Sequence, residues 1–165
     1  TVENTIRTIK ESQADKEKTS DARKAYQVEL IKMVDEDTNA FNRIMDAFGL
    51  PKKTEEEKAA RHQAIQDATK FATEVPFKTM MLCYECMEVV KAMAEIGNPN
   101  SVTDAGVGAL AARSGVIGAF LNVKINAAGL DDKEYANDII SRGEKVVEMA
   151  KQMETDILNI VNSKI

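Results

Sequence analysis

One carboxylate stands at a helical position where the pattern calls for an apolar side chain. Asp37 lies between Val34 and Phe41, and apolar residues recur every three or four positions from Leu30 to Phe48. Burial of a carboxylate costs free energy unless the group is paired or protonated. Desolvation raises the pKa of a carboxyl group toward neutrality, where the group can take up and release a proton. This pattern predicts a catalytic Asp37. The alternative is an aspartate at the stripe's edge that reaches solvent or pairs with a lysine, and the sequence leaves both interpretations open.

A second group of polar residues stands on a segment rich in glycine and alanine. Six of the eight glycines lie between Gly97 and Gly129. Small residues let another backbone or a flat ligand approach closely. The segment therefore predicts tight helix packing, including a subunit interface, or a binding site floored by glycine, and the two are compatible if the site lies at the interface. At helical spacing, one face of residues 101–128 carries Asp104, Gly108, Ala111, Gly115, Ala119, Asn122 and Asn126.

The two cysteines, the histidine and the Gly106-x-Gly108 pair are weaker candidates for a functional site. Cys83 and Cys86 have redox spacing but lie in an apolar, methionine-rich stretch, so we expect two buried thiols in a reducing, cytoplasmic compartment. The single histidine, His62, excludes a multi-histidine metal site within the chain and is expected at the surface. Gly106-x-Gly108 follows no strand and is not a dinucleotide loop. We therefore expect no metal and no prosthetic group.

The elements that must position these residues are helices, because no stretch shows the two-residue period of a strand. We expect an all-α, multi-helix bundle of antiparallel and kinked helices. Residues 1–27 are dense in charge and predict a helical lead-in, and Pro76 is expected to kink or restart a helix. Further boundaries are a stop at Gly49-Leu50-Pro51, a capping box at Thr54 and Glu57, a stop at Gly97, and capping pairs at Ser101/Asp104 and Asp131/Glu134.

Composition limits the kinds of partner. The 165 residues make one domain's length, and 44% of them are hydrophobic. With 22 basic and 27 acidic side chains the net charge is −5, which argues against general nucleic-acid binding. We find no apolar run approaching the ~20 residues of a membrane span and no signal-peptide pattern, so no membrane partner is expected.

Four stretches together resemble the cyclodeaminase domain of formimidoyltransferase-cyclodeaminase, a family that includes stand-alone methenyltetrahydrofolate cyclohydrolases. The resemblance covers residues 28–165, whereas residues 1–27 match the family poorly. The family's first helix, entered through a Pro-Gly-Gly-Gly-Ser segment, has no match, so we expect a fragment or a divergent member. The matching stretches are Val34–Asn42 followed by Leu50-Pro51-Lys52, then Val75-Pro76, Gly97–Ala105 and Gly118–Asn126.

The resemblance implies an all-helical folate enzyme that forms a homodimer or higher homo-oligomer, with its active site in a groove near the subunit interface. Its substrate is a tetrahydrofolate derivative: N10 of 5-formimidoyltetrahydrofolate attacks the formimidoyl carbon, ammonia leaves, and 5,10-methenyltetrahydrofolate forms in histidine-derived one-carbon metabolism. It also implies a fused or associated glutamate formimidoyltransferase as a partner. The family's catalytic aspartate falls on Asp37, and the candidate substrate-binding residues are Asn42, Asp104, Asn122, Lys124 and Asn126.

Two other functions remain open. The first is the cyclohydrolase, which interconverts methenyl- and 10-formyltetrahydrofolate on the same scaffold. The second is a helical scaffold module that has lost catalysis, an interpretation motivated by the missing glycine-rich segment.

Overall fold

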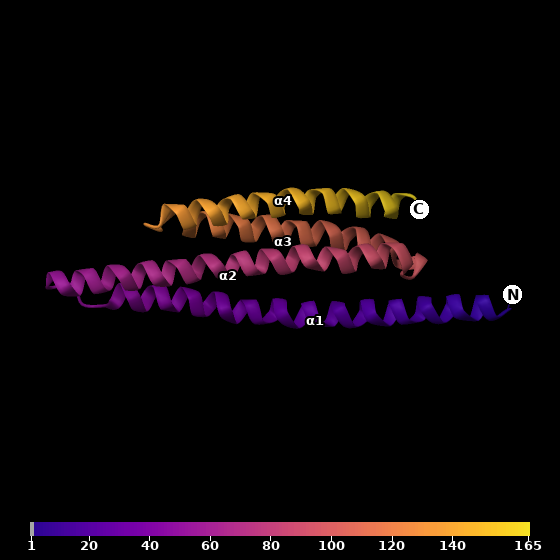
Figure 1. The fold of residues 1–165 in the computed structure, drawn as a ribbon, viewed down its shortest axis with the longest axis horizontal. Helices are drawn as coiled ribbons and strands as arrows, with labels where there is room; N and C mark the ends of the chain where they lie inside the picture. Colours follow the sequence, from indigo (N-terminus) through magenta and orange to yellow (C-terminus); the bar gives the residue numbers. More distant parts are fainter. Residues whose placement is uncertain (1) are drawn as a thin grey trace.

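The computed structural model describes the backbone of residues 2–165 and the side chains from residue 14 onward. This part of the chain contains helices and no strand, which confirms the predicted all-α class. Successive long helices run in opposite directions (Figure 1). They are α1 (Val2–Gly49), α2 (Glu55–Ile96), the short 3-10 helix η1 (Pro99–Ser101), α3 (Val102–Ala128) and α4 (Lys133–Asn162).

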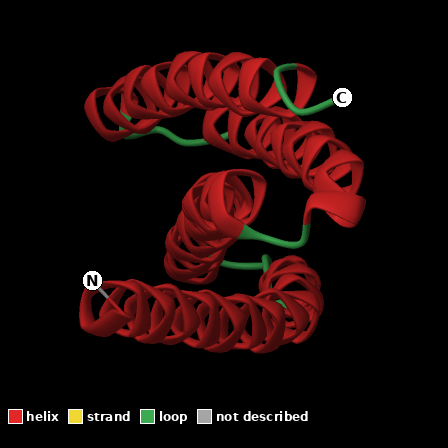
Figure 2. Ribbon diagram, turned by 90° about the vertical axis from the view of Figure 1, so that its right-hand side faces the viewer, coloured by secondary structure: helices red, strands yellow, loops and turns green. Residues whose placement is uncertain are grey.

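The helices form an open, curved arrangement. Helix α2 contacts α1, α3 and α4, and α3 also packs on α4, but within the described part of the chain α1 contacts no long helix except α2. The end-on view in Figure 2 accordingly shows the N-terminal helix at one side of the molecule and the C-terminal helix at the other. Because α1 and α3 flank α2 without touching, a space is left between them.

Two apolar clusters hold the helices together. The larger one joins α2, α3 and α4 and contains fully buried side chains such as Met80, Val116 and Ile157. The smaller one joins α1 to α2 through four buried residues, Met33, Ala40, Ala72 and Val75. Burial of apolar surface is the main favourable term in folding, so the smaller cluster makes α1 the most weakly attached long helix.

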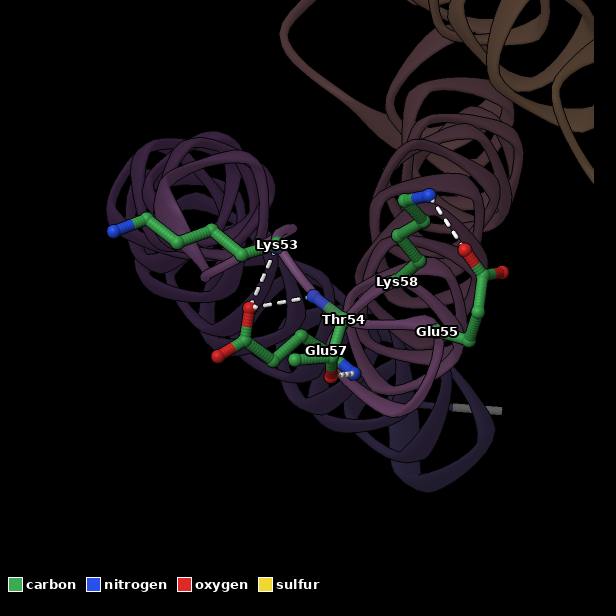
Figure 3. Close-up of polar contacts among 5 residues, drawn as sticks. All are labelled: Lys53, Thr54, Glu55, Glu57 and Lys58. Carbon is green, nitrogen blue, oxygen red and sulfur yellow. Dashed lines mark hydrogen bonds and ion pairs between the residues drawn. The ribbon is translucent and has the colours of Figure 1, made fainter.

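Helix α2 begins with the capping box that the sequence predicts. The backbone N–H of Glu57 donates to Thr54 Oγ1 at 3.2 Å, and the Glu57 carboxylate accepts from the backbone N–H groups of Thr54 and Lys53 (Figure 3). The Lys58 ammonium also reaches the Glu55 carboxylate at 2.6 Å. The contacts of Thr54 and Glu57 satisfy backbone donors that have no partner within the helix, whereas the Lys58–Glu55 pair joins two side chains.

The other predicted starts need correction. Ser101 is the N-cap of α3 by position but makes no side-chain cap, and Asn98 caps the preceding η1 turn instead. Helix α4 is capped by Asp132, whose side chain accepts from the Tyr135 N–H at 3.0 Å, rather than by Asp131. Because α4 begins at Lys133, Asp132 and not Asp131 directly precedes the helix, and the Asp131 carboxylate instead contacts His62, 2.6 Å away.

The predictions for Pro76 and for the glycine at the end of α1 also need correction. Helix α2 runs without a break from Glu55 to Ile96, so Pro76 does not restart it. Gly49 ends α1 as predicted, but no described glycine has a positive φ, so none uses the left-handed cap conformation.

The segment Pro99–Ala128 contradicts the expectation that no stretch has the length of a membrane span. By length and composition alone it would suit a membrane span, because its most apolar stretch contains few charged residues. A core helix meets the same criteria, and α3 packs against both α2 and α4. Only 28% of its most apolar window is buried, however, so a large part of α3 faces outward.

Candidate functional site

The space between α1 and α3 forms a groove with α2 as its floor, which we call the α1–α3 groove. Its volume is about 580 Å³. Leu30 and Val34 of α1, Val90 and Met93 of α2, and Gly108 of α3 make most of it apolar. Small-molecule sites are concave and mostly apolar, with a few polar groups that fix orientation, and this groove has the size and lining of such a site.

Four polar residues with strong hydrogen-bonding groups line the groove. Arg23 is the lining cation, Asp104 is the lining anion, and Tyr26 and Gln27 stand beside Arg23 on α1. No ion pair is formed by Arg23 or Asp104 with any residue whose side chain is described. Burial and the nearby Glu85 carboxylate raise the pKa of Tyr26, so its phenol stays protonated at neutral pH and can donate a hydrogen bond.

The groove floor also carries a thiol. Cys86 lines the groove, and burial raises the pKa of its thiol to about 11. Burial raises the pKa of Cys83 as well. Both cysteines are free and half-buried, and a protonated thiol is a poor nucleophile, so the structure supports the interpretation as thiols without redox function. Cys83 packs so closely on α3 that a Cβ at Gly115 would lie 2.8 Å from its sulfur.

Asp37 is exposed, so its predicted burial is wrong and the solvent-facing alternative holds. Its neighbours Val34 and Phe41 are 66% and 62% exposed, whereas the buried residues of this part of α1 are Met33 and Ala40. The reason is that, among the residues that the structure describes, α1 packs on one long helix, α2, and buries only a narrow stripe against it. The apolar pattern of the sequence includes residues from two adjacent stripes.

The position of Asp37 along α1 still relates it to the groove. The α1 wall follows helical spacing through Gln27, Leu30 and Val34, and Asp37 is the next position in that series. It therefore stands at the end of the groove rather than within its lining. Asn42 lies farther along α1 and is exposed.

The candidate residues on α3 are spread along the helix. Asp104 lines the groove, whereas Lys124 lies 20 residues later, or about 30 Å along the axis at 1.5 Å per residue. The Lys124 ammonium lies 4.8 Å from the centroid of the Phe120 ring. Asn122 is exposed, and its amide donates to the Gly118 carbonyl at 3.5 Å, within its own helix. The structure therefore brings Asp104 alone of these residues into the groove.

Asn126 has a specific contact of its own. Its Nδ2 donates to the carbonyl of Ala72 at 2.7 Å, joining α3 to α2. In an α-helix that carbonyl would accept from the N–H four residues later, but residue 76 is proline and has no N–H. Asn126 thus satisfies the carbonyl that Pro76 leaves without a donor, and this explains how α2 continues through the proline.

Sequence reasoning missed most of the groove's polar residues. Arg23, Tyr26 and Gln27 belong to the segment interpreted as a charged lead-in. The sequence does contain a pattern that identifies Tyr26: it precedes Leu30 and Val34 at intervals of four residues and so extends the apolar stripe of α1 toward the N-terminus. His62 is exposed as predicted. Over the residues that the structure describes, no group of three or more His, Cys, Asp or Glu side chains could hold a metal ion.

Comparison with known proteins adds sequence and fold relatives. A family model described as formiminotransferase-cyclodeaminase matches residues 3–145. A methenyltetrahydrofolate cyclohydrolase of Methylorubrum extorquens is 42% identical over 133 residues, which are 81% of this chain and 64% of that protein. A formimidoyltransferase-cyclodeaminase of Gallus gallus is 33% identical over 136 residues, 82% of this chain and 25% of that protein.

A solved structure has the same fold. The formiminotetrahydrofolate cyclodeaminase of Thermotoga maritima superposes with a TM-score of 0.72 at 20% identity, over 85% of this chain and 66% of that chain. The chain therefore spans about two thirds of the cyclohydrolase and of this solved structure, and about a quarter of the longer relatives.

Proposed function

Because this chain belongs to the formiminotransferase-cyclodeaminase family, we propose that it acts on a tetrahydrofolate derivative that carries a one-carbon group at N5, at N10 or bridging the two. The observation that supports this most directly is the family match over residues 3–145. The groove supports it physically, because an apolar cleft of about 580 Å³ with a carboxylate at its wall suits a flat, hydrogen-bonding ring system.

The first candidate reaction is formimidoyltetrahydrofolate cyclodeamination. The N10–carbon bond forms and the bond from that carbon to the formimidoyl nitrogen breaks. That nitrogen leaves as ammonia with its own proton, the proton from N10 and one further proton, whose charge remains on the methenyl product. The second candidate is the methenyltetrahydrofolate cyclohydrolase reaction, which the 42% identity to the Methylorubrum extorquens protein favours. Both reactions share 5,10-methenyltetrahydrofolate. In the first, N10 displaces ammonia from the carbon on N5; in the second, water adds to the bridging carbon, the carbon–N5 bond breaks, and a formyl group remains on N10.

The chain's residues would contribute mainly by positioning. Ring closure is intramolecular, so holding N5, the carbon and N10 together removes much of the barrier. Apolar walls would hold the pterin, and the Asp104 carboxylate would accept hydrogen bonds from its N–H edge. Asp37, at the end of the groove, would take the proton from N10 and deliver it to the departing nitrogen.

The wider assignments belong to the same proposal. We propose that the chain assembles as a homodimer or higher homo-oligomer. We also propose a cytoplasmic location, which the two free cysteines support. A fused or associated glutamate formimidoyltransferase is included because several relatives are named formimidoyltransferase-cyclodeaminase and extend far beyond the matched part. The proposal includes no prosthetic group.

One assay separates the candidate functions. Purified protein is mixed with 5-formimidoyltetrahydrofolate, and methenyl absorbance and ammonia are followed together. Their joint appearance supports the cyclodeaminase. Hydrolysis of 5,10-methenyltetrahydrofolate without ammonia release from the first substrate supports the cyclohydrolase. Absence of both activities, together with no folate binding by calorimetry, would leave the scaffold interpretation and overturn the proposal.

A further inference from the structure

Arg23 and Asp104 lie on opposite walls of the α1–α3 groove and at the same end of it. Ala22, the residue before Arg23, lines a small pocket together with Val89 of α2. A Cβ built at Gly108 would lie 3.5 Å from the side chain of the next residue of α2. Asp104 stands one helical turn before Gly108. Arg23 and Asp104 therefore flank the same stretch of the groove floor.

The charges of these two residues are not matched within the described part of the chain. Arg23 and Asp104 form no ion pair with each other or with another residue whose side chain is described. Helix α2 separates α1 from α3, so the two charged groups lie on either side of the groove. A ligand that enters between them meets a hydrogen-bond donor on one wall and an acceptor on the other.

Of the three polar residues that line the groove from α1, Arg23 alone has a fixed hydrogen-bonding role. A guanidinium group donates and never accepts, whereas the Gln27 amide can do either by rotating. The Tyr26 hydroxyl can also do either, and the nearby Glu85 carboxylate attracts its proton. Arg23 is therefore the residue of the α1 wall that can distinguish an acceptor from a donor on a ligand.

The edge of a 4-oxopterin ring carries the pattern that these two walls would bind. Its N3–H and 2-amino groups are neighbouring donors, and its O4 oxygen, on the other side of N3, is an acceptor. A carboxylate can accept from both N–H groups, as proposed for Asp104, and a guanidinium can donate a charge-assisted hydrogen bond to O4. A ring with an amino group at position 4 would instead place a donor against the guanidinium, which cannot accept from it.

We propose that Arg23 is a specificity-determining residue that donates to O4 of the pterin ring held by Asp104, so that the groove selects 4-oxo over 4-amino pterins. This inference rests on the proposed folate function and adds to it the α1 residue that recognises the ring. Apolar walls hold a flat ring without fixing its orientation, and a few polar groups have to do so. Contacts from both walls to one ring edge determine which end of the ligand lies at this end of the groove.

Two matched ligands test this assignment. Tetrahydrofolate and tetrahydroaminopterin differ in the oxygen or amino group at position 4, and their affinities for the chain are measured by anaerobic calorimetry. Wild type is expected to bind tetrahydrofolate about tenfold more tightly, because a guanidinium leaves the 4-amino group without an acceptor. Arg23→Met should weaken tetrahydrofolate binding by about tenfold and leave tetrahydroaminopterin binding nearly unchanged, so the preference should disappear.

A neighbouring cation provides the matched control. Lys24 does not line the groove, and its ammonium lies 3.3 Å from the Asp21 carboxylate. Lys24→Met therefore removes the same charge from α1 and should leave both affinities at their wild-type values. Arg23 and Lys24 are both exposed, so both variants should fold, and circular dichroism checks this.

The same measurements can overturn the proposal. A wild type without preference between the two ligands, or unchanged affinities in Arg23→Met, would remove Arg23 from recognition of the ring. Equal losses for both ligands, together with weaker binding of p-aminobenzoylglutamate to Arg23→Met, would assign Arg23 to the acidic tail that the ligands share. These results would leave the proposed function standing, whereas a wild type that does not bind tetrahydrofolate would overturn the proposed function as well.

Discussion

At the residue scale, Asp37 is the side chain on which the proposed chemistry depends. It is exposed and contributes nothing to either apolar cluster, so Asp37→Asn should fold and bind folate normally. Loss of the proton carrier should lower the turnover rate by about 10²–10⁴-fold. The matched control is Asp35→Asn, another exposed acid of α1 that lies on a different helical face. Wild-type turnover in Asp37→Asn would remove its catalytic assignment.

Asn126 gives a prediction about stability. Asn126→Ala leaves the Ala72 carbonyl without its donor, and an unsatisfied buried carbonyl costs about 1–3 kcal/mol. In a Pro76→Ala background the new backbone N–H can bond to that carbonyl, so the same substitution should cost much less. Urea unfolding of the four proteins measures this coupling. Equal costs of Asn126→Ala in both backgrounds would show that Asn126 does not compensate for the proline.

Cys86 predicts how stability depends on pH. Burial raises the pKa of its thiol from an ordinary 9.0 to about 11, so the folded state keeps the proton at pH values where the unfolded chain has lost it. The resulting stabilisation is complete below pH 9 and is lost as the pH rises through 11. Cys86→Ala should therefore flatten the decline of the urea midpoint between pH 9 and 11. An unchanged slope would contradict the assignment, since Cys83 and Tyr135 keep their raised pKa values in both proteins.

At the element scale, α3 and α4 meet through a glycine. A Cβ at Gly143 would lie 2.6 Å from Cδ2 of Phe120, a side chain that is itself buried. Gly143→Ala is therefore expected to destabilise the protein by about 1–3 kcal/mol, because the ring has to move out of a packed core. Gly49→Ala is the control, since nothing lies within 4 Å of a Cβ at Gly49. Thermal unfolding that gives equal midpoints for both variants would refute this account of the contact.

Helix boundaries could be predicted from the sequence where local chemistry decides them. The Thr54–Glu57 capping box and the stop at Gly49 depend on residues a few positions apart, and both are found. Asp131 and Asp132 are both suitable caps by residue type, and α4 begins one residue later than the Asp131/Glu134 pair predicts. The contact of the Asp131 carboxylate with His62, 69 residues away, depends on tertiary packing and leaves no mark on the local pattern.

The candidate site was less predictable for a related reason. Apolar spacing on α1 is compatible with burial of either of two adjacent stripes, and which one is buried depends on how many helices pack around α1. Since α2 is its single long-helix neighbour in the described structure, the stripe with Ala40 is buried and the one with Phe41 is exposed. Arg23 and Tyr26 were missed because a charged segment indicates solvent unless its position beside α2 and α3 is known.

At the scale of the whole molecule, the helices differ in how firmly they are held. The α2–α3–α4 cluster contains all of the fully buried large hydrophobic side chains in the described structure, whereas α1 is attached through four buried residues. Helix α1 is also one complete wall of the groove. The wall that a ligand would contact is therefore the part with the least packing to hold it.

This arrangement predicts local opening of α1. Amide hydrogen exchange should give lower protection for residues 23–34 of α1 than for the buried stretch of α4 from residue 146 to 157, because segments with few buried contacts open before the core does. Tetrahydrofolate in the groove would bridge α1 and α3, so saturating ligand should raise protection in residues 23–34 and leave α4 nearly unchanged. The wild-type protein with and without ligand suffices for this measurement. Equal protection of the two helices without ligand would contradict the weak attachment of α1, and protection gained only in α4 would place the ligand outside the groove.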